Sequence, residues 1–193
     1  MSSAPDEPVR QRRPVRTAAL AVGVVAVLLV GVLGYEVVTG GDDGVRSGLV
    51  GRAAPAVVGT ATDGSAVDID RWRGEWVLVN FFATWCVPCV REHPELVEFA
   101  RRHGPAGDGV PVEVVSVAFD DDPVAVEEFF ATRGGDWPVL VDDTGPIALD
   151  YGVRGVPESY LVSPAGQVVG VFYGVTADAL DEAIATATSG ASS

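Results

Sequence analysis

Long apolar runs mark the strands at the centre of this chain. Residues 76–83, with the sequence WVLVNFFA, are almost continuously apolar, which is typical of a strand covered on both faces. Similar runs occupy residues 112–119 and 137–141. The segments between and after these runs are predicted to form helices, over residues 86–103, 122–133, 147–151 and 177–188. Because strands alternate with helices, the pattern predicts an α/β fold in which a mixed central sheet is flanked by helices on both faces.

Two hairpins complete the predicted domain. Residues 56–60 and 65–68 flank an Asp-Gly turn at residues 63–64, which is a strong signal for an N-terminal hairpin. Residues 158–163 and 167–173 flank a Pro-Ala-Gly turn and are predicted to form the second hairpin. The second hairpin and the helix after it would be the last elements of the domain.

The first 38 residues predict a membrane anchor. Residues 17–35 carry no charge and are about as long as a helix that spans a bilayer. Four arginines precede them, so the positive-inside rule places residues 1–16 in the cytoplasm as an N-terminal tail. We therefore expect a transmembrane signal anchor over residues 17–38 and a single-pass protein of the cell membrane, with its folded domain on the extracytoplasmic side. A cleaved signal peptide is the alternative, whereas a lipoprotein is excluded because no cysteine follows the apolar run.

The remainder divides into a linker, a domain and a tail. Residues 39–48 are rich in Gly and Asp and predict a flexible linker, residues 49–188 the folded domain, and residues 189–193 a disordered tail. The net charge of −14 is unevenly spread, because residues 1–16 carry +2 and the rest of the chain −16. Binding to nucleic-acid phosphates needs a basic face, so this acidic domain excludes nucleic acid as a partner.

The two cysteines of the chain, Cys86 and Cys89, lie where a predicted buried strand meets a helix. Two cysteines are too few for a disulfide-stapled scaffold, so the pair is free for chemistry. A helix N-terminus stabilises an anion, so Cys86 should be partly thiolate and act as the nucleophile. Cys89, one turn deeper, can then resolve the mixed disulfide. This arrangement, directly after Trp85, predicts a protein-disulfide oxidoreductase that needs no cofactor and no metal.

Metal and haem chemistry are the alternatives for a C-x-x-C pair. The cysteines could be half of a zinc site with His93 as a third ligand, for which only His103 is left as a further nitrogen donor. Both histidines are instead predicted to lie on the helix surface. Covalent haem attachment would need a histidine directly after Cys89, where this chain has Val90. The aspartates at residues 120–122 are predicted to form a solvated turn and a helix cap.

The segment Asn80–Pro94, with the sequence NFFATWCVPCVREHP, resembles the extracytoplasmic thioredoxin-like reductases of cytochrome c maturation. These include the TlpA, ResA and CcmG (DsbE) groups, and the resemblance covers about residues 50–187. It implies a thioredoxin fold with an N-terminal hairpin and an inserted strand at residues 137–141. The N-terminal anchor agrees with the same group.

The resemblance also implies site residues beyond the cysteine pair. Pro157 matches the cis proline that faces the cysteines in these folds, and the backbone of Val156 could bind an extended substrate beside Trp85. Glu92 matches a glutamate that could accept or relay the proton of the resolving thiol, and Glu158 matches the Pro-Glu pair of the CcmG group. The alternatives are a solvated helix residue for Glu92 and an exposed residue at the start of a strand for Glu158. We expect Glu92→Gln to change the thiol titration and to affect stability little.

The main functional hypothesis follows from this resemblance. Cys86 and Cys89 would be kept reduced and would reduce disulfides in apocytochrome c, with electrons from a membrane thiol carrier of the CcdA or DsbD type. Two alternatives stay open: a general oxidase of secreted proteins, which differs only in redox poise, and a thioredoxin-like binding module or metal chaperone whose cysteines hold a ligand.

Overall fold

A computed structural model of the protein describes residues 48–190, and the fold is given for these residues. Within them, no helix is both long and apolar enough to cross a bilayer. The predicted cytoplasmic tail at residues 1–16, the anchor at 17–38 and all but the last residue of the linker lie outside the described residues, as do residues 191–193.

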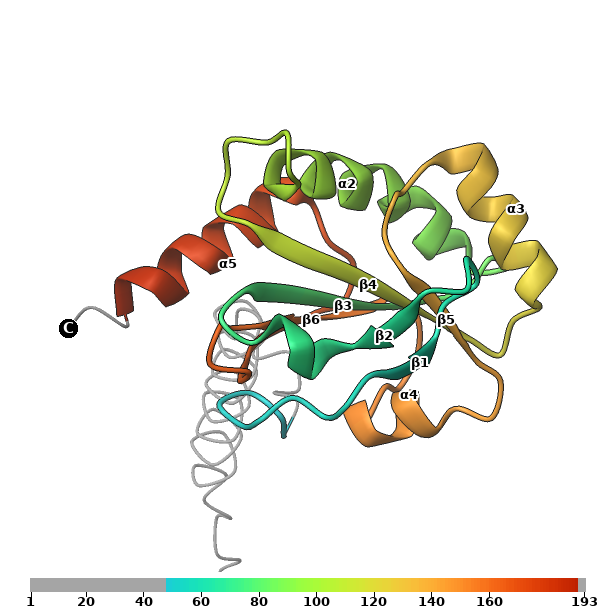
Figure 1. Ribbon diagram of the computed structural model, residues 1–193, viewed down its shortest axis with the longest axis horizontal. Helices are drawn as coiled ribbons and strands as arrows, with labels where there is room; N and C mark the ends of the chain where they lie inside the picture. The colour runs from blue at the N-terminus through green and yellow to red at the C-terminus, as the bar shows by residue number, and fades with distance from the viewer. Residues whose placement is uncertain (1–47, 191–193) are drawn as a thin grey trace, which may run out of the picture. The chain divides into compact units, whose positions relative to one another are not determined.

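The central sheet has five strands in the order β5-β4-β3-β6-β7 (Figure 1). These strands are β3 (Trp76–Phe82), β4 (Val112–Phe119), β5 (Val139–Asp142), β6 (Glu158–Val162) and β7 (Val168–Phe172). Strand β4 runs parallel to both β3 and β5, whereas β6 is antiparallel to both β3 and β7. A separate hairpin pairs β1 (Val58–Thr60) with β2 (Ala66–Asp68). The sheet is therefore mixed, as the alternation of elements predicts, and the inserted strand β5 forms its parallel edge.

Helices cover both faces of the sheet (Figure 1). They are the 3-10 helix η1 (Ile69–Trp72), α2 (Val87–His103), α3 (Pro123–Arg133), α4 (Pro146–Tyr151) and α5 (Ala177–Gly190). Successive side chains of a strand point to opposite faces, and β3 shows the consequence. Leu78 lies in one core cluster with Leu96 of α2 and Leu180 of α5. Phe81 lies in the opposite cluster, with its ring centroid 5.1 Å from that of Tyr151 in α4.

The predicted strands and helices are all present, with ends that differ by at most two residues. Asp122 caps α3 as predicted, because its carboxylate accepts hydrogen bonds from two backbone N–H groups of the first turn. The expectation of disorder from Ser189 onward is wrong for two residues, because α5 continues to Gly190. The hydroxyls of Thr188 and Ser189 each donate to a carbonyl group one turn earlier, which satisfies both side chains within the helix.

Candidate redox site

Cys86 and Cys89 lie at the junction of β3 and α2 and form a disulfide bond. Cys86 is the N-cap of α2, and its sulfur accepts a hydrogen bond from the backbone N–H of Cys89 at 3.2 Å. Pro88 stands in the first turn, where the absence of an N–H group costs no helical hydrogen bond. The free N–H groups of this turn and the helix dipole favour negative charge on the sulfur of Cys86, as a nucleophilic thiolate requires.

The loop between α4 and β6 packs against the cysteine pair. The Val156–Pro157 peptide bond is cis, as the resemblance implies. The sulfur of Cys86 lies 3.5 Å from the carbonyl oxygen of Val156. Val156 and Pro157 are both half-buried, so the backbone at this point is close to the disulfide and still partly open to solvent.

Trp85 precedes the disulfide and exposes 61% of its surface. Its indole N–H donates to the carbonyl oxygen of Asp120 at 3.0 Å. The carboxylate of Asp121 accepts from the backbone N–H of Thr84 at 2.5 Å and from its hydroxyl at 2.8 Å. The loop between β4 and α3 therefore holds the two residues that lead into Cys86. The prediction of a solvated turn and cap at residues 120–122 is right for the cap and wrong for Asp121, whose carboxylate binds another segment.

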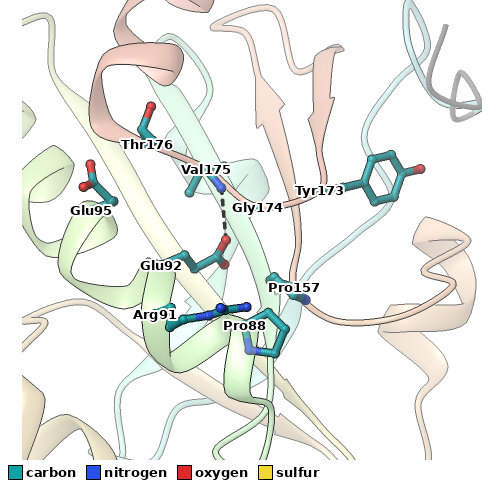
Figure 2. A pocket seen from close by; sticks show the side chains of 9 residues that line it. All are labelled: Pro88, Arg91, Glu92, Glu95, Pro157, Tyr173, Gly174, Val175 and Thr176. Atoms are coloured by element: carbon teal, nitrogen blue, oxygen red, sulfur yellow. Dashed lines mark hydrogen bonds between the residues drawn. The ribbon is translucent and has the colours of Figure 1, made fainter. Parts of the chain in front are cut away.

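A groove of about 540 Å³ lies beside the redox pair, and Glu92 contributes to its wall (Figure 2). The side chains that line it include Pro88, Arg91, Glu92, Glu95, Pro157 and Tyr173. Glu92 is only 8% exposed, so the alternative of a solvated helix residue is wrong. Its two carboxylate oxygens accept from the side-chain nitrogen of Asn80 at 3.3 Å and from the backbone N–H of Val175 at 3.0 Å.

These surroundings act on the titration of Glu92 in opposite directions. Burial penalises the charged form and raises the pKa of Glu92 to about 7, against the lowering effect of the hydrogen bonds from Val175 and Asn80. A carboxyl group with this pKa can both accept and release a proton near neutral pH. The expectation that Glu92→Gln affects stability little assumed an exposed side chain, whereas the side chain is buried.

Glu158 does not line the groove. Its side chain is 1% exposed, and its carboxylate accepts from the hydroxyl of Tyr160 at 2.5 Å and from the backbone N–H of Arg154 at 3.2 Å. The alternative of an exposed residue at the start of a strand is therefore wrong. In this position Glu158 braces the loop that carries Val156 and Pro157.

The prediction that both histidines lie on the helix surface is wrong. His93 packs among the rings of Phe129, Phe130 and Trp137, and its Nε2 lies 2.9 Å from a backbone carbonyl oxygen at the end of α3. This burial lowers the pKa of His93 below its usual value. His103 is buried against α5, with Nε2 2.6 Å from a carboxylate oxygen there. No three His, Cys, Asp or Glu side chains among residues 48–190 form a group that could hold a metal ion.

Sequence reasoning missed Ser116 and Ser159, two of the three polar side chains beneath Glu92. Asn80, Ser116 and Ser159 are each 1% exposed and belong to the apolar strands β3, β4 and β6. Isolated polar residues within such runs are a signal of a buried polar group that needs partners. The sequence shows that signal, but only the pairing of the strands reveals that the three side chains meet.

The sequence of this chain is similar to a protein family and to known thiol–disulfide proteins. The profile of the Redoxin family matches residues 49–188. The thiol-disulfide oxidoreductase ResA of Bacillus subtilis (strain 168) is 29% identical over 165 residues, which cover 86% of this chain and 89% of ResA. The thiol:disulfide interchange protein HelX of Rhodobacter capsulatus is 36% identical over 124 residues, which cover 63% of this chain and 66% of HelX.

A solved structure has the same fold. The thiol:disulfide interchange protein of the thioredoxin family from Chlorobium tepidum superimposes with a TM-score of 0.62 at 26% sequence identity. The match covers 69% of this chain and 94% of that protein. The thioredoxin fold expected from the resemblance is therefore confirmed.

Proposed function

This chain belongs to the Redoxin family, and we propose that it reduces disulfides of apocytochrome c before haem attachment. It is a thiol–disulfide oxidoreductase of the ResA, HelX and DsbE type, so its substrates are proteins with thiols or disulfides. The observation that carries the proposal is the position of Cys86. Its sulfur caps α2 and lies 3.5 Å from the carbonyl oxygen of Val156, beside the cis proline.

The exchange proceeds in two steps. In the reduced enzyme, the Cys86 thiolate attacks one sulfur of the substrate disulfide, which forms a mixed disulfide and releases the other substrate sulfur as a thiolate. The Cys89 thiolate then attacks the sulfur of Cys86. This releases the second substrate thiolate and leaves the Cys86–Cys89 disulfide, so two electrons have passed from the enzyme to the substrate. The backbone of Val156 would pair with an extended substrate during the attack.

Glu92 would accept the proton of the resolving thiol. It follows Cys89 by one helical turn on α2 and forms part of the groove beside the pair. Burial keeps its pKa near neutral, which suits a group that takes a proton from one thiol and later returns it. The charged form is the acceptor, so this step would require Glu92 to be ionised when Cys89 attacks.

A source of electrons and a place in the cell complete the proposal. A membrane thiol carrier of the CcdA or DsbD type would reduce the Cys86–Cys89 disulfide after each turnover. Val87 and Pro88, between the cysteines, bring no positive charge to stabilise a thiolate as in a strong oxidant. The apolar, uncharged residues 17–35 after four arginines support an anchor that holds the domain on the extracytoplasmic side.

Trapping tests the assigned roles of the two cysteines. Cys89→Ala should accumulate mixed disulfides with substrate proteins, because the resolving thiol is gone, and Cys86→Ala should accumulate none. The species are counted on non-reducing gels and identified by mass spectrometry. Trapping by Cys86→Ala alone would reverse the two roles.

The direction of electron flow is tested in cells. Alkylation of free thiols after acid quenching should find the Cys86–Cys89 pair mostly reduced. Deletion of the gene should lower the content of covalently attached haem c, and an added small-molecule thiol should restore it. A mostly oxidised pair, together with disulfide loss from secreted proteins in the deletion strain, would instead identify a general oxidase. Normal haem c content with Cys86→Ser would favour a binding module.

Protease accessibility tests the location. External protease should digest the domain in intact protoplasts while a cytoplasmic marker survives. A domain that stays protected until the membrane is lysed would contradict the extracytoplasmic placement.

A further inference from the structure

A row of three polar side chains crosses the sheet beneath the redox site. Asn80 of β3 pairs directly with Ser116 of β4 on one side and with Ser159 of β6 on the other. Directly opposite residues of adjacent strands point to the same face of a sheet. Glu92 reaches this row from α2, and Trp137 reaches it from the segment before β5.

In this row of hydrogen bonds, each side chain donates to the next one, from Trp137 to Ser116, then to Asn80, and then to Ser159 and Glu92. The indole N–H of Trp137 can only donate, and it lies 2.8 Å from the hydroxyl oxygen of Ser116. The single hydrogen of Ser116 is directed to the carbonyl oxygen of the Asn80 amide, at 3.3 Å. The NH₂ end of Asn80 therefore points the other way, toward Ser159 at 3.0 Å and Glu92 at 3.3 Å.

We propose that Ser116 and Trp137 are positioning residues of the redox site, which fix the Asn80 amide so that its NH₂ group and not its oxygen faces Glu92. Neither residue is among those that line the groove. Trp137 packs against the core cluster that contains both cysteines. Their effect on the reaction passes through the proton-accepting role proposed for Glu92, and rests on it.

The orientation of the amide decides which form of Glu92 is favoured. In the observed orientation both carboxylate oxygens face donors, Asn80 and the backbone N–H of Val175, and donors stabilise the ionised form. A protonated Glu92 would carry an O–H group that neither neighbour can accept. If the amide turned over, its oxygen would accept from that O–H group and favour the protonated form.

Few other charges compete with this effect. The titratable side chains that share the groove with Glu92 are Arg91 and Glu95 of α2 and Tyr173 after β7. On the sheet side, Glu92 bonds to the neutral amide of Asn80, whose own partners are the neutral hydroxyls of Ser116 and Ser159. The orientation of one amide can therefore shift the titration of Glu92 measurably.

The test is the titration of Glu92 in the full chain with Ser116→Ala. This substitution removes the donor to the Asn80 oxygen, so the amide can turn over, and we expect the pKa of Glu92 to rise by about one pH unit. Carbon NMR of labelled glutamate carboxyl groups measures it, with Glu92→Gln to assign the signal. Trp137→Phe should shift it in the same direction and less far, because Ser116 keeps its hydroxyl but loses the donor that orients it.

Ser159→Ala is the matched control. It removes a buried serine from the other side of Asn80 and leaves the Ser116 bond that fixes the amide, so the shift should be clearly smaller. Circular dichroism confirms that each variant is folded. An unchanged titration in both Ser116→Ala and Trp137→Phe, or an equal shift in Ser159→Ala, would overturn the positioning role.

The pH profile of disulfide exchange separates this inference from the function on which it rests. If both hold, the acidic limb of the rate profile moves to higher pH by the same amount as the Glu92 titration, and Ser116→Ala has no effect on the profile in a Glu92→Gln background. A shifted titration with an unmoved rate profile would support the positioning of Asn80 and contradict the proton-accepting role of Glu92.

Discussion

Glu92 has an acidic side chain that is almost completely buried, and the two hydrogen-bond partners of its carboxylate are both donors. Hydrophobic and polar patterns in the sequence do not show whether such a residue is buried or solvated. Its pKa of about 7 lies well above the usual value of 4.5. The difference means that the folded protein binds a proton that the unfolded chain has already released at intermediate pH.

We expect this difference to appear in the stability of the protein. As pH rises from 4.5 to 7, the unfolded chain loses the Glu92 proton while the folded protein keeps it, so the contribution of Glu92 to the free energy of unfolding falls with rising pH. The whole effect is of the order of 3 kcal/mol. Glu92→Gln cannot ionise and should remove this slope, so the variant gains stability relative to the native protein as pH rises.

Urea unfolding between pH 4.5 and pH 8 measures this prediction. Glu95→Gln is the control, because it changes another carboxylate of the same groove and leaves Glu92 in place, so the slope should remain. If Glu92→Gln and the native protein lose the same stability over this range, Glu92 does not titrate with a raised pKa.

At the scale of an element, the contact between α2 and α5 combines an exposed ion pair with a buried polar contact. Arg102, in the last turn of α2, contacts both Asp178 and Asp181 of α5 at 2.7 Å. Asp181 in addition lies 2.6 Å from Nε2 of His103, which is buried, whereas Asp178 is 87% exposed. Exposed ion pairs contribute little to stability, but the loss of a partner for a buried polar group is costly.

The two aspartates should therefore differ on substitution. Asp181→Ala should lower the free energy of unfolding by about 1–2 kcal/mol, because buried His103 loses its partner on α5. Asp178→Ala removes only an exposed pair and should change it by less than about 0.5 kcal/mol. Chemical denaturation of both variants at one pH gives the comparison. Equal losses would mean that the buried histidine adds nothing to the contact between the helices.

At the scale of the molecule, the redox site depends on four segments that the sheet brings together. The β3–α2 junction supplies the cysteines, the α4–β6 loop the cis proline, the β4–α3 loop the contacts to Thr84 and Trp85, and the β7–α5 connection the backbone N–H of Val175. All four belong to the compact unit that begins at Arg46. The chemistry therefore needs the folded domain, and the proposed anchor would add only location.

This division leads to a prediction for a shortened chain. Residues 46–193 alone should unfold cooperatively at the same temperature as the full chain and should reduce a soluble disulfide at the same rate, because the contacts of the site lie within this unit. Calorimetry and an insulin-reduction assay measure both properties. In cells, the same chain exported without an anchor should restore less haem c than the full chain. Full restoration would show that tethering is dispensable.

Local patterns in the sequence determined the elements and the redox pair. Apolar runs predicted β3 and β4, the Asp-Gly turn predicted the first hairpin, and the position of Cys86 between a strand and a helix predicted the reactive sulfur. These features depend on residues close together in the chain, where side-chain period and capping chemistry act directly. The cis bond before Pro157 came from the family resemblance and not from any local pattern.

The tertiary structure alone decided the surroundings of the polar side chains. Glu92 bonds to Val175, 83 residues away, and Asn80 bonds to Ser159, 79 residues away. Such contacts depend on which strands pair and in which register, and a shift of one residue would turn each side chain to the other face of the sheet. Sequence patterns therefore gave both histidines a surface position and left a solvated position open for Glu92, whereas the folded chain buries all three and supplies each with a hydrogen-bond partner.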